Sequence, residues 1–528
     1  MPNRSTDALF TLIKSLEKSE KRNFKLFAGR NSGQNDLKTT QLFDALDKMD
    51  EYDEATLLKK NPELKKQQLS NMKAQLYRQI LMSLRLIRDH ENIDIQLHEQ
   101  MDFARVLYNK GLYIQSLKLL DRIKETARSK FQYTYVMQAL IFEKKIEALH
   151  ITRSMEDRAE QLSREIETVM TQLTLINRLS NLSLQLYSWY IKMGHARDEK
   201  DVNAVKLFFE TGLPQYAHQS LGFYEKLYLY QSYVWYAFIL QDLLQYYRYT
   251  QKWVDLFTGS PFMIGIETSQ YIKGLHNLLN AHFMLGNYER FAEALEQFEQ
   301  FSNSNECTFS DNARIQTFVY LQTARINKHF MEGTFTEGLA LIPEIEAQLD
   351  DYKLQLDRHR ALVFYYKIAC LYFGSGDNEK AIDYLNRIIN WKVDLRTDLQ
   401  CYSRLLHLIA HYELGNFTLL EYLIKSVYRF MAKMQNLSVV EEEIFRFLRK
   451  SFYLSPKQVK TAFKLLKEKL EKYRGNPLES RSYLYLDIIG WLESKIEGIP
   501  VQEVIRRKYL ESRKKRQGSG RDAVAGQE

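Results

Sequence analysis

The sequence has little proline and glycine. Of its 528 residues, 8 are proline and 21 are glycine, and residues 63–213 contain no proline at all. A β-sandwich or β-barrel needs turn residues roughly every 8–12 positions, so this scarcity excludes those folds. Hydrophobic residues make up 45% of the chain, which is enough to bury a large core and to exclude general disorder.

Cysteine and long apolar runs are also scarce. The three cysteines, Cys307, Cys370 and Cys401, are far apart and form no CxxC motif, so neither a zinc ribbon nor a redox pair is indicated. The first residues carry no secretory signal, and no apolar run approaches the roughly 20 residues that cross a bilayer. We therefore expect a cytoplasmic protein in a reducing compartment, without membrane contact.

Motifs for catalysis, cofactor binding and metal binding are missing. The sequence contains no phosphate-binding loop, dinucleotide fingerprint or nucleophile elbow. His98 begins a segment similar to the zinc-protease motif, but Asp102 replaces the second histidine. His407 and His411 stand one helical turn apart, and Leu408 follows the first of them instead of a glutamate, so packing is the favoured interpretation. We expect no enzyme activity, no cofactor and no metal.

Apolar residues recur at helical spacing almost everywhere and predict an all-α fold. The clearest case predicts one helix over about 63–90, with its apolar residues three or four positions apart: Leu69, Met72, Leu76, Ile80, Leu84 and Ile87. Residues 1–95 are interpreted as a helical N-terminal unit.

Beyond residue 95 the chain repeats a helix–glycine–helix pattern. Five copies share a glycine that is followed two residues later by an aromatic or polar residue, at Gly111, Gly286, Gly333, Gly376 and Gly415. Weaker turns are predicted near Arg153, Gly194 and Asp242. The eight turns are 39 to 48 residues apart, a period that indicates an α-solenoid of about eight helix pairs over residues 96–440.

One copy resembles the tetratricopeptide (TPR) repeat. The matching residues of its first helix and turn are Asn277, Leu278, Asn280, Ala281, Phe283, Gly286, Asn287 and Tyr288. The resemblance covers about 104–431, although the period here exceeds the TPR period of about 34 residues. It implies a concave groove that binds a protein or peptide, without catalysis. By the same resemblance, the groove residues are Lys273, His276, Asn280, Tyr320, Asn327 and Lys367.

Two further segments leave alternatives open. Residues 223–257 hold 13 aromatic residues, which suit an inter-repeat core, a peptide groove or base stacking. Residues 444–528 carry a net charge of +10, whereas residues 1–443 carry −2. A basic stripe of Lys457, Lys460, Lys464 and Lys467 suits a solvated capping helix, an acidic partner or a nucleic-acid backbone.

These features predict a TPR-like α-solenoid with a basic helical C-terminal cap over residues 441–500 and a basic, disordered tail over residues 501–528. The favoured function is a non-enzymatic scaffold that binds a protein or peptide partner in its groove. The alternative is a nucleic-acid-associated or regulatory protein that uses its basic C-terminal end while the repeats recruit a partner. A peptide sensor that changes its superhelical pitch suits the same residues.

Overall fold

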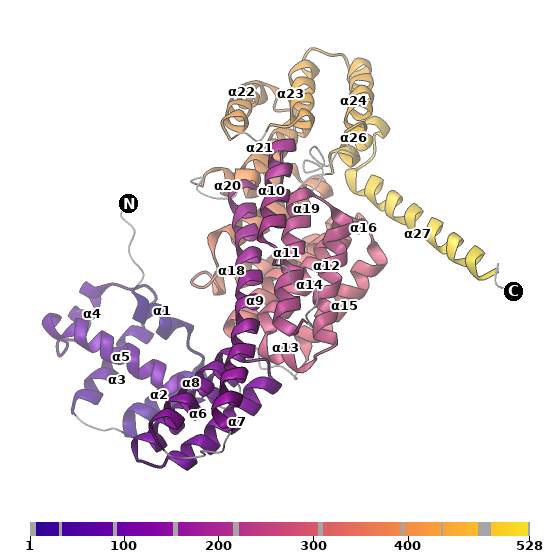
Figure 1. The fold of residues 1–528 in the computed structure, drawn as a ribbon. Coiled ribbons are helices and arrows are strands. Elements are labelled where there is room, and N and C mark those ends of the chain that lie inside the picture. Colours follow the sequence, from indigo (N-terminus) through magenta and orange to yellow (C-terminus); the bar gives the residue numbers. More distant parts are fainter. Residues whose placement is uncertain are drawn as a thin grey trace. The chain divides into compact units, whose positions relative to one another are not determined.

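The structure is a computed structural model, and every regular element among the residues it describes is a helix (Figure 1). The described residues are 7–30, 34–87, 92–150, 157–214, 221–304, 310–391, 397–434, 437–473 and 487–525. Within these ranges no helix is both long enough and apolar enough to span a membrane. The predicted all-α class is confirmed.

The chain divides into two compact units, unit 1 over Met1–Val169 and unit 2 over Met170–Glu528. The division falls inside one long helix, α9 (Arg158–Met193). The helices that lie wholly within unit 1 are α1 (Ala8–Ser15), α2 (Lys18–Arg30), α3 (Gln34–Asp47), α4 (Glu54–Lys60), α5 (Lys66–Ile87), α6 (Ile93–Asn109), α7 (Tyr113–Ser129) and α8 (Tyr133–Leu149). Helix α5 confirms the long helix predicted over 63–90. The predicted domain boundary at residue 95 stays a prediction.

A buried ionic network joins α7, α8 and the start of α9 in unit 1. Glu143 is fully buried and pairs with both Lys124 and Arg158. Arg158 also pairs with Glu165 at 3.2 Å. Each charge in this network meets an opposite charge, which is the condition under which ions are tolerated away from water.

Many helices of unit 2 pack against the helix that follows them in the chain. The pairs that bear on the site are α11 (Phe223–Leu240) with α12 (Leu243–Thr258), α14 (Thr268–Met284) with α15 (Tyr288–Asn303), and α19 (Arg358–Ser375) with α20 (Asn378–Ile389). Between them, α16 (Asp311–Glu332) is followed by three short helices, α17 (Phe335–Gly338), η1 (Leu339–Leu341) and α18 (Ile342–Asp351). The remaining helices are α10 (Glu199–Gly212), α13 (Phe262–Ile266), α21 (Thr397–Glu413), α22 (Phe417–Lys433), α23 (Val439–Ser451), α24 (Pro456–Glu471), α26 (Ile488–Glu497) and α27 (Val501–Ala525).

The five strongest predicted turns share one backbone conformation. Each glycine has a positive φ, between +65° and +94°. The amide after the glycine donates a hydrogen bond of 2.9–3.1 Å to the carbonyl five residues earlier, in the pairs Leu112–Leu107, Asn287–His282, Thr334–His329, Asp377–Tyr372 and Asn416–His411. This pattern is the Schellman motif, and it ends a helix where glycine adopts the left-handed conformation without a Cβ penalty.

The weaker turns give a mixed result. Gly194 has a φ of +75° and ends α9, as predicted. The turn predicted near Asp242 is made by Gln241, whose φ is +59°. The turn predicted near Arg153 lies outside the described residues. A further turn at Phe131 was missed because a φ of +60° at a phenylalanine leaves no signature in the sequence.

The basic tail predicted to be disordered instead begins with helix α27. Val504 is fully buried, and Ile505 and Tyr509 are nearly so. These residues recur at helical spacing and give the segment an apolar face that packs against α16 and α19. The burial of this face accounts for the difference from the sequence prediction.

Ala281 tests the packing between paired helices, because its side chain is only 1% exposed. We expect Ala281→Arg to destabilise unit 2 by about 3 kcal/mol or more, since the guanidinium has neither space nor a partner there. Urea unfolding measures the change. Leu244→Arg is the matched control, because Leu244 is 71% exposed on α12 and its replacement should change stability by about 0.5 kcal/mol or less. Equal stability of the two variants would contradict this packing.

Candidate functional site

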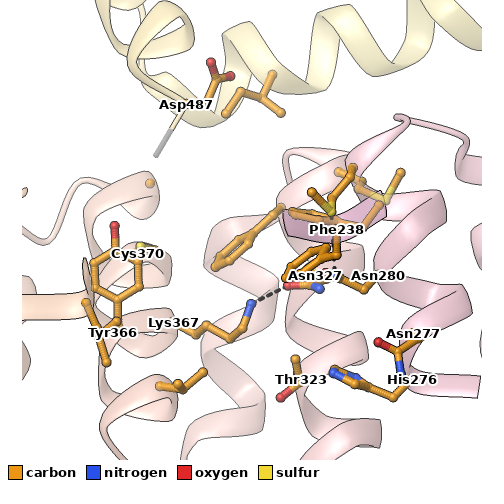
Figure 2. Close-up of a pocket in the computed structure, with 18 of the residues that line it drawn as sticks. Phe238, His276, Asn277, Asn280, Thr323, Asn327, Tyr366, Lys367, Cys370 and Asp487 are labelled. Atoms are coloured by element: carbon orange, nitrogen blue, oxygen red, sulfur yellow. Dashed lines mark hydrogen bonds between the residues drawn. The ribbon is translucent and has the colours of Figure 1, made fainter. Parts of the chain in front are cut away.

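A cavity of about 500 Å³ lies within unit 2, a volume typical of ligand sites. Its polar residues come mainly from α14, α16 and α19, which are the first helices of three successive repeats. Aromatic residues of α11, α12 and α16 form much of the apolar wall. Figure 2 shows the polar side chains of the three helices turned toward a common space.

Lys367 is the central charged group of the cavity. Its ammonium donates a hydrogen bond of 2.6 Å to Asn327 Oδ1, drawn as the dashed line in Figure 2, and lies 5.5 Å from the Phe330 ring centre. No ion pair joins Lys367 to a carboxylate within the described ranges. Burial without a counter-ion lowers the pKa of Lys367 to about 8, so the ammonium is charged at neutral pH at a cost in stability.

Two further cations surround His276. Its ring stacks on Tyr320 with ring centres 4.1 Å apart, and Arg360 lies 5.8 Å from the centre of the same tyrosine ring. Lys273, one turn before His276, lies over the rings of Tyr187 and Trp235 at 5.0 Å and 5.4 Å. Burial, followed by the charges of Lys367, Lys273 and Arg360, lowers the pKa of His276 to about 3. The imidazole is therefore neutral, and the local field is positive.

A chain of hydrogen bonds fixes the amide side chains on α14. The Tyr246 hydroxyl donates to Asn277 Oδ1 at 3.0 Å, and Asn277 Nδ2 donates to the carbonyl of Lys273 at 2.7 Å. Asn280 Nδ2 donates to the Tyr246 oxygen at 3.3 Å. Burial raises the pKa of Tyr246, so its hydroxyl stays protonated and keeps this chain in place.

Four of the six groove residues expected from the TPR resemblance line this one cavity, namely His276, Asn280, Asn327 and Lys367. The other two, Lys273 and Tyr320, lie directly beside it through their contacts with Trp235 and His276. The structure therefore brings the six residues together. Their role in binding a partner stays a prediction.

The aromatic segment 223–257 contributes to both the core and the cavity. Trp253 and Phe257 are fully buried, which agrees with the inter-repeat core interpretation. Trp235, Phe238 and Tyr246 line the cavity, which agrees with the groove interpretation. The core interpretation therefore holds for part of this helix pair, whereas the binding of a peptide by its other aromatic residues stays a prediction.

The potentially reactive side chains near the cavity are held in unreactive states. The Cys370 thiol contacts the Tyr366 hydroxyl, and burial raises the pKa of the thiol to about 12. A thiol that stays protonated is a poor nucleophile. Elsewhere in unit 2, the rings of His407 and His411 pack edge to face at 4.4 Å, and His411 Nδ1 contacts the Asn416 amide at 3.1 Å. No cluster of three or more potential metal ligands occurs in the described part of the chain.

The predicted basic stripe on α24 is only partly free. Lys457, Lys460 and Lys464 are exposed, and none of them forms a salt bridge within the described residues. Lys467, by contrast, pairs with Glu493 at 2.9 Å and with Glu471 at 3.5 Å. The stripe therefore offers three free lysines where the sequence predicted four.

The contribution of the C-terminal segment to the cavity was not predicted from the sequence. Asp487, Val501 and Ile505 form part of its lining, and Figure 2 places Asp487 at the top of the view, on the C-terminal segment. The only signal was the apolar spacing of Val501, Val504 and Ile505 within a strongly basic stretch. That spacing predicts an amphipathic helix but not the surface on which it packs.

The solved structures that this chain matches include two of low sequence identity. A Rap protein complexed with competence and sporulation factor has 11% sequence identity and a TM-score of 0.40, covering 80% of this chain and 98% of its own. The apo form of RapI has 10% sequence identity and a TM-score of 0.36, and the match covers 79% of this chain and 99% of the RapI chain. No protein-family model and no curated protein matches the chain. Similarity at this level supports no assignment of the site.

Buried neutral histidines predict a loss of stability in mild acid. Burial, together with His411 and Arg404, lowers the pKa of His407 to about 4. The unfolded chain then binds a proton that the folded chain does not, so stability is fully present above about pH 6.5 and falls as the pH decreases toward 4. We expect the protonation of His407 alone to lower the free energy of unfolding by about 2 kcal/mol between pH 7.5 and pH 5.

Urea unfolding of unit 2 at both pH values measures this loss. His407→Gln should show a smaller difference between the two pH values than the wild type. The control is His98→Gln, because His98 is exposed in unit 1. A wild-type pH dependence in His407→Gln would show that His407 is not the responsible group.

Proposed function

We propose that this chain is a non-enzymatic helical-repeat protein that binds a peptide or protein segment carrying an anionic group in the cavity of unit 2. The observation that carries the proposal is Lys367, a buried ammonium whose hydrogen-bond partner is an amide and which has no carboxylate partner among the described residues. Cys370 and Cys401 are buried thiols that form no disulfide, which supports a cytoplasmic location.

An anionic group suits the cavity because two of the three cations in and beside it have no carboxylate partner among the described residues. Lys273 and Lys367 have no salt-bridge partner among the described residues. Arg360 pairs with Asp357 at 3.0 Å, a pair that is partly exposed. A carboxylate beside Lys367 would gain a charge-assisted hydrogen bond in a site of low polarity, where such bonds are strong.

A peptide suits the cavity because free amide atoms line it. Asn327 Oδ1 accepts from Lys367, which leaves Asn327 Nδ2 without a hydrogen bond in the described structure. Asn280 Nδ2 donates to the Tyr246 oxygen and the Met284 sulfur, whereas Asn280 Oδ1 has no hydrogen bond in the described structure. One free donor and one free acceptor match the N–H and C=O groups of a peptide backbone. The aromatic wall supplies apolar contact area for side chains.

Replacing Lys367 should separate binding from stability. Lys367→Met keeps the volume and removes the charge, so we expect affinity for the natural ligand to fall at least tenfold. The Tm should stay the same or rise, because the variant no longer buries an uncompensated charge. The ligand is first identified by mass spectrometry of protein purified from its native host, and calorimetry then compares the two proteins.

Lys460→Met is the matched control, since Lys460 is exposed on α24. It should retain wild-type affinity. Unchanged affinity in Lys367→Met would contradict the proposed cavity, and a large drop in its Tm would show that Lys367 is a structural residue.

The nucleic-acid alternative has a separate test on α24. Three free lysines meeting three phosphates would give a log–log salt slope of about −2.7 on duplex DNA. We expect no measurable binding of labelled DNA or RNA at physiological salt, because Lys467 is already paired with Glu493. Binding with that slope, which Lys457→Ala/Lys460→Ala/Lys464→Ala flattens, would instead favour the alternative.

A further inference from the structure

The C-terminal segment contributes residues to the cavity lining. Contacts with other helices of unit 2 hold the segment on both sides of these residues. On one side, α26 is fixed to the end of α21, where Glu413 accepts from Trp491 Nε1 at 2.7 Å and pairs with Lys495 at 2.8 Å. On the other side, the first turns of α27 pack against α16 and α19. Val501 and Ile505, on those first turns, line the cavity.

The contacts of α27 converge on the Gly333 turn between α16 and α17. Gln502 accepts from the Thr336 hydroxyl at 2.8 Å, and Arg506 donates to the carbonyl of Glu332 at 3.3 Å. Tyr509 packs edge to face on Tyr288, with ring centres 4.7 Å apart. Beside these contacts, Val504 and Ile505 bury the apolar face of the same turns, so α27 is held on the Gly333 turn by both polar and apolar contacts.

Gly333 itself determines how closely α27 approaches. A Cβ added at this position would lie 2.3 Å from the backbone nitrogen of Arg506 and 2.8 Å from the carbonyl oxygen of Gln502. Among the glycine turns with positive φ in the described chain, this one alone has backbone so close. Gly333 therefore meets two requirements, a left-handed turn and a site where another helix lies directly on the backbone.

We propose that α27 is a latch that controls access to the ligand cavity, and that the Gly333 turn is the surface on which it packs in the closed state. When α27 lies on this turn, Val501 and Ile505 close one side of the cavity. When it lifts, that side opens while the repeats stay folded. This inference rests on the proposed function for its biological meaning, but the latch itself is tested without any ligand.

Cys370 provides the probe, because it lines the cavity and is 8% exposed. In a Cys307→Ser background, its rate of modification by N-ethylmaleimide at pH 8.5 reports how often the cavity opens. Cys401 is fully buried and outside the cavity lining, so its rate reports general loosening of the core. Mass spectrometry of the two cysteine-containing peptides separates the rates.

The decisive comparison is Gly333→Ala against Gly286→Ala. Both glycines have nearly the same φ, +68° and +65°, so both variants carry the same backbone strain. Only the first places a methyl group against α27, since a Cβ at Gly286 meets nothing within 4 Å. We expect Cys370 to react at least tenfold faster in Gly333→Ala than in Gly286→Ala, with the Cys401 rate equal in the two.

A second variant removes the contacts without adding a clash. Gln502→Ala/Arg506→Ala deletes the hydrogen bonds to Thr336 and Glu332. This variant should also raise the rate of Cys370 modification and leave the rate of Cys401 modification unchanged. Equal Cys370 rates in the two glycine variants would overturn the latch. If Cys401 is also modified faster in Gly333→Ala, the Gln502→Ala/Arg506→Ala variant decides between the explanations. A wild-type rate of Cys370 modification in that double variant would also overturn the latch. None of these results depends on whether the cavity binds a peptide.

Discussion

The architecture depends on one backbone feature, a residue in the left-handed conformation at the end of the first helix of a pair. In the glycine turns, the amide that follows this residue reaches back five positions and satisfies a carbonyl that the helix end would leave unpaired. The chain then reverses within a few residues, and the second helix returns along the first. A regular reversal places successive first helices side by side, which is how α14, α16 and α19 come to share one cavity.

That arrangement carries an energetic cost in unit 2. In unit 1 the buried Glu143 is compensated by Lys124 and Arg158, whereas in unit 2 the buried Lys367 has an amide as its only hydrogen-bond partner among the described residues. Uncompensated buried charge destabilises a folded protein. Burial lowers the pKa of Lys367, and burial together with the neighbouring cations lowers the pKa of His276. A packing role gives no reason for a cation at this position. An anionic ligand does, because it would supply the missing counter-charge.

What the sequence predicted well was local. Glycine turns such as Gly286 and Gly376 could be recognised because left-handed backbone strongly favours glycine. The six residues that the TPR resemblance places in the groove, counted from those turns, lie in or beside one cavity, and their role in binding stays a prediction. The features that were not predicted from the sequence depend on contacts between distant segments or have no local signal. The continuity of α9 and the turn at Phe131 have no composition signal, and the packing of α27 on Gly333 joins residues more than 160 positions apart.

The same long-range packing gives the basic C-terminal end a new interpretation. Arg507 pairs with Glu497, and Lys508 pairs with Glu493, so part of the excess charge is neutralised within the segment. Arg506, Arg513 and Lys514 have no carboxylate partner among the described residues, and they extend along α27 away from the cavity lining. Positive charge on a protein surface raises the local concentration of anions and their rate of association. The charge that first suggested nucleic acid therefore suits the proposed anionic peptide equally well, and it lies on the helix proposed to admit that peptide.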